Sequence, residues 1–306
     1  MNNWNNRPLE GCLFEDTAVA APLVLSHSTA TLPSQVDLRP FCSPVEDQRQ
    51  TNSCTANAIV SALEYYQRRT GLNLTGLSRM FVYYNARKLI DQENYDCGSY
   101  IHHVMASVLA YGACEEQLWP FDPRLRRMCP SPAAYADAIK HQAIQYGRAP
   151  LGDSALSALA AGIPVVFGTR IPSEFYTVAD QTGAMPMPGP ILQASGPGHA
   201  MLLVGYDLNS RNWIVRNSYG PSFGNNGYFQ LPFSTMEAYS VPIDFWTIGA
   251  IEQNGIVLKQ DALPAADFDA PTHLEIDLDK LRASIRNTLA SNLESSTAGF
   301  RSRLRS

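Results

Sequence analysis

The sequence predicts an α+β protein in which a helical half precedes a β-rich half. Between residues 54 and 141, apolar residues recur at intervals of three and four within runs bounded by Ser, Gly and Pro, the pattern of amphipathic helices. Between residues 164 and 231, short apolar runs alternate with turns rich in Gly, Asn and Pro, the pattern of strands. Because helices and strands are segregated along the chain, α+β is favoured over an alternating α/β fold.

The composition is that of an ordinary globular protein. The chain has 306 residues, of which 45% are hydrophobic and 17% charged, and a formal net charge of −5, so it can bury a large core in one or two domains. The mild acidity gives no reason to expect nucleic acid as the main partner, and no run of about 18 apolar residues predicts a membrane span. The N-terminus lacks a Sec-type signal, so we expect a cytoplasmic protein or one exported without such a signal.

The chain starts with an irregular leader and a proline-punctuated lead-in. Residues 1–31 are rich in Asn, Ala, Ser and Thr and show little periodicity, whereas residues 32–40 indicate an extended segment. After a polar loop, the first helix is predicted from Cys54 to about Arg69, where a Thr-Gly pair ends it.

Cys54 lies in the first turn of that helix. Asn52 or Ser53 is the expected N-cap, because a short side-chain oxygen accepts from the free amides of the opening turn. Those amides and the positive end of the helix dipole favour thiolate over thiol, so Cys54 is a candidate nucleophile. The alternative from this stretch alone is a small, buried, apolar side chain.

Three further helices and four strands complete the predicted core. The helices are expected at residues 79–90, 100–111 and 132–141, and the strands at residues 164–169, 199–206, 212–217 and 227–231. A loop rich in Pro, Gly and Met, residues 177–197, separates the first two strands. A connection of this length is often functional.

The core pattern fades after residue 256. Residues 257–306 are predicted to form a linker, an amphipathic helix at 274–293 and a disordered tail with three arginines. The helix either docks on the rest of the chain or self-associates, so the sequence leaves the oligomeric state open.

The six cysteines indicate neither a disulfide framework nor a metal site. They are scattered between residues 12 and 129, with no CxxC pair and no Cys/His pattern at metal-ligand spacing. We therefore expect reduced, structural thiols and no bound metal.

His199 and Asn217 supply the partners that a nucleophilic cysteine needs. His199 follows a Ser-Gly-Pro-Gly run and opens an apolar strand, and Asn217 ends the next strand. If these strands are antiparallel neighbours, the amide oxygen of Asn217 lies beside the His199 ring and can hold its tautomer. Standing alone, His199 would be interpreted as a core histidine.

Four short motifs follow one another along the sequence in a characteristic order. They are Gln48 six residues before Cys54, Gly-His-Ala at 198–200 leading into Leu-Val-Gly-Tyr, Arg-Asn-Ser-Tyr-Gly at 216–220, and Asn-Gly-Tyr at 226–228. Together they resemble the papain-like cysteine peptidases, and the plain loops around the cysteine and histidine resemble the bacterial branch of that family. The histidine lies 145 residues after the cysteine, within the family's range of about 130–150.

The resemblance implies a role for each matching residue. Cys54 would be the thiolate nucleophile, His199 its ion-pair partner and later the general acid, and Asn217 the residue that orients His199. Gln48 and the backbone N–H of Cys54 would stabilise the oxyanion. The implied activity is endopeptidase cleavage of a peptide or protein substrate through an acyl-enzyme, without a cofactor.

The resemblance also implies a two-lobed papain-like fold. The match covers roughly residues 32–256, so these residues would form the catalytic domain. A helical lobe, about 54–150, and an antiparallel β-barrel-like lobe, about 151–256, would face each other across the active-site cleft.

Substrate contacts are expected at four residues, Gly98, Ser99, Gly198 and Tyr219. Gly98 would let a substrate backbone approach the edge as an added strand, although this stretch could be merely the turn before the third helix. Tyr219 replaces the family's tryptophan that shields the Asn–His pair. Thr51 stands where the family commonly has a cysteine, so the usual disulfide cannot form there.

The resemblance also implies a possible role for the leader. Family members are commonly zymogens whose N-terminal extension runs through the cleft in the direction opposite to substrate. Residues 1–31 are too few for the usual helical pro-domain, but we hypothesise that part of residues 5–28 covers the cleft and lowers activity. The alternative is a leader without effect. A transferase or deconjugating enzyme with the same triad, and a catalytically silent peptide-binding protein, are the rival functions.

Overall fold

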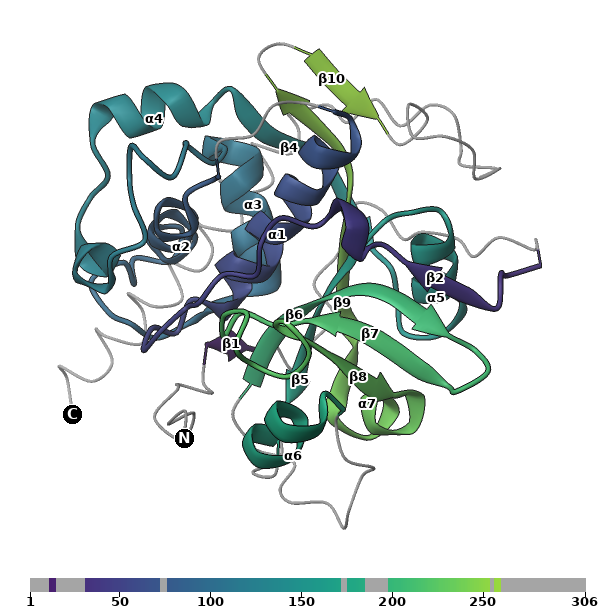
Figure 1. Cartoon of the computed structure of the whole chain (residues 1–306). Coiled ribbons are helices and arrows are strands. Elements are labelled where there is room, and N and C mark those ends of the chain that lie inside the picture. The colour runs from purple at the N-terminus through teal and green to yellow at the C-terminus, as the bar shows by residue number, and fades with distance from the viewer. Residues whose placement is uncertain are drawn as a thin grey trace, which may run out of the picture.

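The computed structural model describes residues 11–14, 31–71, 76–171, 175–184, 198–253 and 256–259 (Figure 1). The helices within residues 54–138 gather on one side of this part of the chain, and a large sheet with three short helices beside it lies on the other. The longer helices are α1 (Cys54–Arg69), α2 (Arg79–Lys88) and α3 (Ile101–Tyr111), and the shorter ones are α4 (Pro132–Ala138), α5 (Asp153–Ala160), α6 (Phe175–Thr182) and α7 (Phe233–Tyr239).

Helix α1 is the centre of the molecule. Residues 54–67 are all buried, because small and apolar side chains predominate on every side of the helix. It contacts α2 and α3 on the helical side and β6 (Gly198–Asp207) on the sheet side. The N-terminus of α1 is therefore held against the strand that begins with Gly198 and His199.

An eight-stranded antiparallel sheet forms the second half of the fold. Its main path runs β10-β9-β5-β6-β7-β8, with β2 paired to β6 and β4 paired to β9. The strands not yet given are β2 (Gln35–Asp37), β4 (His141–Arg148), β5 (Val165–Arg170), β7 (Asn212–Arg216), β8 (Tyr228–Pro232), β9 (Ser240–Gln253) and β10 (Ile256–Lys259). Over the described residues the sheet does not close into a barrel.

The sheet register brings two distant residues together. Strands β6 and β7 are antiparallel, with Leu202 opposite Arg216. The start of β6 therefore lies beside the end of β7. Consequently, His199 and Asn217 become neighbours although 18 residues separate them in sequence.

Strands β4 and β10 were not among the expected elements. Residues 141–148, within the range assigned to the helical lobe, form β4 and pair with β9. Both strands mix polar and apolar residues, so neither has a clear strand pattern in the sequence. They form because they pair with each other over a long sequence separation. Residues 256–259 extend the sheet past the expected domain end.

Parts of two sequence predictions lie outside the described residues. Residues 177–182, expected in a loop, belong to α6, and residues 185–197 of that loop are not described. The amphipathic helix predicted at 274–293 and the tail after it also lie outside the described residues.

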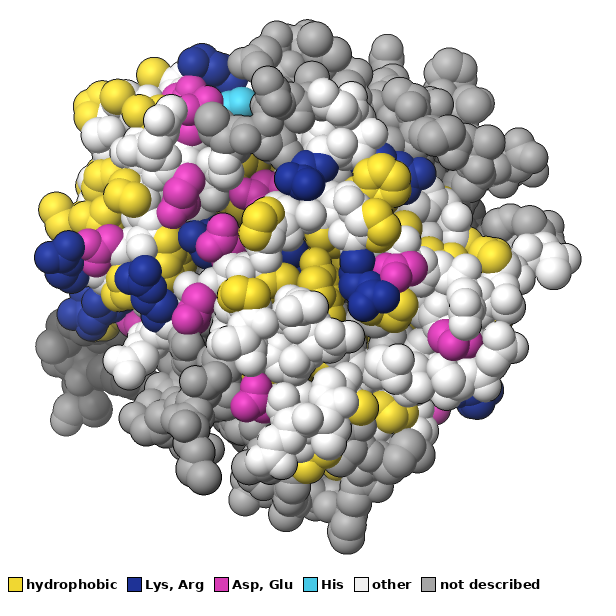
Figure 2. Space-filling model, viewed as in Figure 1, with side chains coloured by type: hydrophobic (Ala, Val, Ile, Leu, Met, Phe, Trp, Pro, Cys, Tyr) yellow, Lys and Arg dark blue, Asp and Glu magenta, His cyan; other side chains and the backbone are white. Residues whose placement is uncertain are grey.

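The surface and the helices agree with the charge and hydropathy of the sequence. On the face shown in Figure 2, Lys and Arg side chains of the described residues are interspersed with Asp and Glu side chains, so that face has no continuous basic surface of the kind that binds nucleic acid. None of the helices in the described ranges combines the length and the apolar character needed to cross a membrane.

Candidate active site

Cys54 is the first residue of α1, and its side chain is 0% exposed. Ser53 occupies the N-cap position, but its side chain makes no capping hydrogen bond. Its Oγ instead lies 2.7 Å from Thr51 Oγ1 and accepts from the Asn57 side chain at 3.0 Å. The expectation of a side-chain cap was therefore wrong, and the opening amides of α1 are left to face the thiol.

Burial has the largest effect on the pKa of the Cys54 thiol. Burial raises its pKa to about 12, and the backbone N–H groups of Ala200, Thr55 and Cys54 offset only part of this effect. Desolvation of the charged form thus outweighs the helix N-terminus. The expectation that the helix start favours thiolate was wrong for the covered site.

His199 and Asn217 form the expected pair. The His199 Nε2 and Asn217 Oδ1 atoms are 2.9 Å apart. Because an amide oxygen can only accept, Nε2 carries the hydrogen and Nδ1 keeps its lone pair. Nδ1 is buried and has no hydrogen-bond partner within the described residues. Burial lowers the pKa of His199 to about 4, although the Asn217 hydrogen bond offsets part of this effect.

Tyr219 covers the His–Asn pair. Its ring stacks on the His199 ring, with centroids 5.0 Å apart and planes 25° apart. Its edge-to-face neighbours are Phe175 and Phe223, and its side chain is fully buried. This residue therefore lies where it excludes water from the pair rather than on an open binding surface.

Gln48 is fixed beside the same loop. It is fully buried, and its side-chain oxygen accepts from Ser218 Oγ at 2.6 Å. Its Nε2 donates to the Thr51 carbonyl at 2.9 Å. An amide nitrogen carries two hydrogens, so one remains for a second acceptor.

The edge predicted to bind substrate is attached to α1. The Thr55 and Ser99 hydroxyl oxygens are 2.6 Å apart. Gly98 has a φ of 77°, a left-handed conformation suited to glycine, and its N–H donates to the Tyr83 hydroxyl at 3.1 Å. The backbone N–H that faces the cleft is therefore that of Ser99.

Residues 11–14, which we call the strap, cover the nucleophile. They include β1 (Cys12–Leu13), which pairs in parallel with β3 (Ser99–Tyr100) (Figure 1). The Ser99 N–H donates to the Gly11 carbonyl at 3.0 Å. A Cβ atom on Gly11 would lie 2.6 Å from Cys54 Sγ, so only glycine fits over the thiol.

The strap continues along the start of β6. A Cβ atom on Gly198 would lie 2.2 Å from the Cys12 carbonyl oxygen and 2.5 Å from the Phe14 ring. The Arg170 guanidinium lies 5.4 Å from the centre of the Phe14 ring. Gly198 therefore borders the chain that occupies the site.

The strap residues carry only a weak signal in the sequence. Gly11 is followed by three apolar residues, Cys12, Leu13 and Phe14, within an otherwise largely polar stretch. This run lies inside the range 5–28 that we expected to reach the cleft. Its pairing partner could not be identified, because a strand of two residues has no recognisable period.

Comparisons with known proteins agree with this geometry. Residues 32–242 match the family model described as papain family cysteine protease. The chain is 34% identical over 213 residues to an uncharacterized peptidase C1-like protein of Acanthamoeba polyphaga mimivirus, covering 66% of this chain and 68% of that protein. It is 32% identical over 212 residues to cathepsin K of Gallus gallus, covering 65% and 58% of the two chains.

A solved structure is similar over most of both chains. The structure of xylellain, a cysteine protease from Xylella fastidiosa, superposes with a TM-score of 0.70 at 30% identity, covering 81% of this chain and 97% of that one. Sequence, fold and family model agree, and the chain belongs to the papain family of cysteine proteases.

Proposed function

We propose that this cysteine peptidase is an endopeptidase in which Cys54 is the nucleophile, His199 the acid and base, and Asn217 the orienting residue. The observation that carries the proposal is the contact between the two halves of the fold. The N–H of Ala200, the residue after His199, points to the Cys54 thiol, while Asn217 holds the far side of the imidazole. The likeness to xylellain supports a place in the bacterial branch of the family.

The reaction follows from the tautomer of His199. The Nδ1 lone pair takes the proton of Cys54, and the thiolate attacks the carbonyl carbon of the scissile bond. The tetrahedral intermediate then collapses to a thioester as imidazolium protonates the leaving amine. Water, deprotonated by His199, cleaves the thioester and restores the thiol.

Gln48 supports the charge that develops on the carbonyl oxygen. The hydrogen of Nε2 that Thr51 leaves unused and the backbone N–H of Cys54 are the two donors. The Ser218 hydroxyl holds the Gln48 side chain at 2.6 Å, so little reorganisation accompanies the reaction. One preorganised donor of this kind lowers the barrier by about 3 kcal/mol.

We further propose that the strap restrains this activity in the manner of a zymogen. Gly11 occupies the space over Cys54, and the strap uses the Ser99 N–H that a substrate backbone would need. It runs parallel to β3, which fits an extension that crosses the cleft in the direction opposite to substrate. Opening of the strap is thus required before a peptide binds.

The experiment is turnover of a series of short peptide–fluorophore substrates. We expect cleavage by the full chain to be abolished by Cys54→Ala and by an epoxide-type thiol trap, because both remove the nucleophile. Cys129→Ala is the matched control, since Cys129 is an exposed free thiol, and should leave turnover unchanged.

The chain beginning at Thr31 completes the test. If neither it nor the full chain cleaves any substrate, and if the trap does not label Cys54 in either form, the peptidase proposal is wrong and a silent peptide-binding protein remains. If cleavage persists in Cys54→Ala, another residue is the nucleophile.

A further inference from the structure

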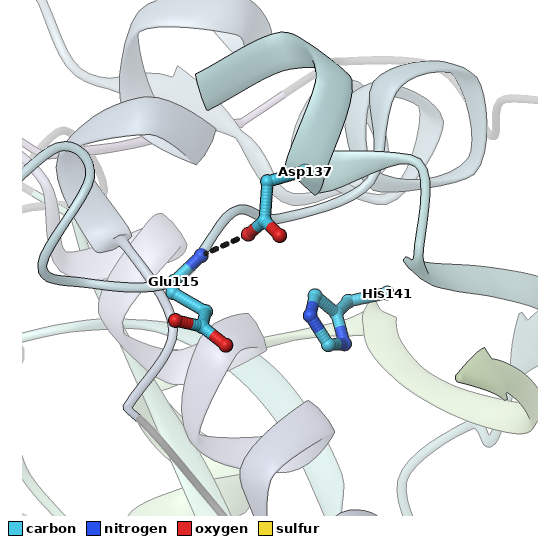
Figure 3. Close-up of side chains that lie close together, drawn as sticks. All are labelled: Glu115, Asp137 and His141. Atoms are coloured by element: carbon cyan, nitrogen blue, oxygen red, sulfur yellow. Dashed lines mark hydrogen bonds between the residues drawn. The ribbon is translucent and has the colours of Figure 1, made fainter. Parts of the chain in front are cut away.

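Three potential metal ligands meet where α4 ends and β4 begins. They are Glu115, on the segment after α3, Asp137, in the last turn of α4, and His141, the first residue of β4. One ligand atom from each lies within 4.8 Å of the other two. Figure 3 shows the imidazole of His141 and the two carboxylates around a common gap, with one ring nitrogen on the side of the carboxylates.

The backbone fixes these three residues in place. The Ala113 N–H donates to the His141 carbonyl at 3.0 Å, and the Glu115 N–H donates to Asp137 Oδ2 at 2.9 Å. Gly112 allows the close approach, because a Cβ atom there would lie 1.8 Å from the carbonyl oxygen of Ala138. The ligand geometry is thus set before any ion arrives, which reduces the entropy lost on binding.

His141 is poorly explained as an ordinary core residue. Its side chain is only 6% exposed, and its Nδ1 is buried without a hydrogen-bond partner in the described part of the chain. An imidazole binds a metal ion in its neutral form, through a ring nitrogen that carries no hydrogen. Its imidazole also lies beside the two acids, with ligand atoms of all three residues within 4.8 Å of one another, so it can offer a ring nitrogen to a cation that the carboxylates bind as well.

The carboxylates have the charge that a cation needs. Burial alone would raise the pKa of Asp137, but the Glu115 N–H and the Lys140 ammonium outweigh it, so the pKa is lowered. Glu115 is half-buried, and Gln117 donates to its Oε2. Each Asp137 oxygen accepts one hydrogen bond, Oδ2 from the Glu115 N–H and Oδ1 from Lys140, and keeps a lone pair for a cation.

We propose that Glu115, Asp137 and His141 bind one divalent cation of the zinc class. Two carboxylate oxygens and one imidazole nitrogen are ligands that zinc accepts, and the partial exposure of Glu115 leaves room for a water as the fourth ligand. The ion joins the segment after α3 to the α4–β4 junction. Because β4 pairs with β9, it ties the helical side of the fold to the edge of the sheet.

Lys140 is the local competitor of the cation. Its Nζ lies 2.9 Å from Asp137 Oδ1, and its side chain is 52% exposed. The ammonium can swing into solvent, but its charge opposes the incoming ion. Removal of this charge should therefore tighten metal binding, whereas removal of a ligand should weaken it.

The experiment is calorimetric titration with Zn²⁺ of the full chain carrying Cys54→Ala, which keeps the catalytic thiol out of the titration. We expect one equivalent of Zn²⁺ to bind to this chain, in which Glu115, Asp137 and His141 are unchanged. His141→Ala should abolish that binding, and Glu115→Gln should weaken it about tenfold or more. Lys140→Gln should tighten it, and Asp122→Asn, a carboxylate paired with Arg124 elsewhere, should leave it unchanged.

Two further measurements keep the proposal falsifiable. Glu115 is half-buried, so Glu115→Gln should leave the chain folded. If His141→Ala fails to fold, the Zn²⁺ affinity of Glu115→Gln therefore decides whether the site exists. Zn²⁺ should raise the melting temperature of the parent more than that of Glu115→Gln, since an ion that binds only the folded state stabilises it. Co²⁺ should give no thiolate charge-transfer band at one equivalent. Equal Zn²⁺ affinity in the parent and in Glu115→Gln, or a thiolate band, would overturn the proposal.

Discussion

At pH 7, iodoacetamide should alkylate Cys54 about 100-fold more slowly in the full chain than in the chain beginning at Thr31. With a pKa of about 12, the covered thiol is ionised in only about one molecule in 10⁵. A raised pKa removes thiolate at every pH below it, so alkylation proceeds only after the strap opens. Burial of the Phe14 ring and one backbone hydrogen bond oppose opening by about 3 kcal/mol together, which corresponds to the expected factor.

The measurement is the rate of label incorporation into the peptide that contains Cys54. The other five cysteines carry no disulfide, so each peptide has to be followed separately by mass spectrometry. Cys129, which is exposed and lies outside the segment that pairs with the strap, serves as the internal reference and should react at similar rates in the two chains. Equal Cys54 rates in the two chains would mean that the strap does not protect the thiol.

Gly11→Val should activate the full chain without truncation. A Cβ atom at Gly11 would lie 2.6 Å from Cys54 Sγ and 2.7 Å from the Asn52 carbonyl oxygen. The Asn52 carbonyl cannot retreat, because the Asn52 N–H and side chain are both held by Asp96. The strap is then expelled, and peptide turnover should rise about 10- to 100-fold, toward that of the chain beginning at Thr31.

The matched control for Gly11→Val is Gly76→Val. Gly76 is exposed, and a Cβ atom there would meet no atom closer than 3.6 Å, so the same gain in side-chain bulk should leave turnover unchanged. If the truncated chain is fast but Gly11→Val remains as slow as the parent, the segment that restrains activity is not residues 11–14. If the parent, Gly11→Val and the chain beginning at Thr31 all cleave the peptide at the same rate, the leader does not restrain the enzyme.

Local signals allowed much of the fold and the catalytic residues to be predicted. Helix α1 begins at Cys54 and ends at Arg69 as expected, since an apolar period and a Thr-Gly stop are both local signals. The pairing of His199 with Asn217 was predicted from two adjacent strands joined by a short connection. Such neighbours in sequence are neighbours in a sheet in most antiparallel folds.

Features that depend on distant contacts could not be predicted. The pKa of Cys54 is raised by burial, and the strap, which packs over the thiol from about 40 residues upstream, is part of what buries it; the helix start alone indicated the opposite direction. Strands β4 and β9 pair across about 100 residues. The cluster of Glu115, Asp137 and His141 has no metal-ligand spacing in the sequence and is assembled by the meeting of three segments.

The covalent intermediate tests the central claim most directly. The chain beginning at Thr31 is mixed with a peptide ester, quenched in acid during turnover, and analysed by intact mass and peptide mapping. We predict an adduct with the mass of the acyl group on the peptide that contains Cys54, and its absence in Cys54→Ala. Steady turnover of the ester with no adduct on Cys54, or with the adduct on another residue, would contradict the account.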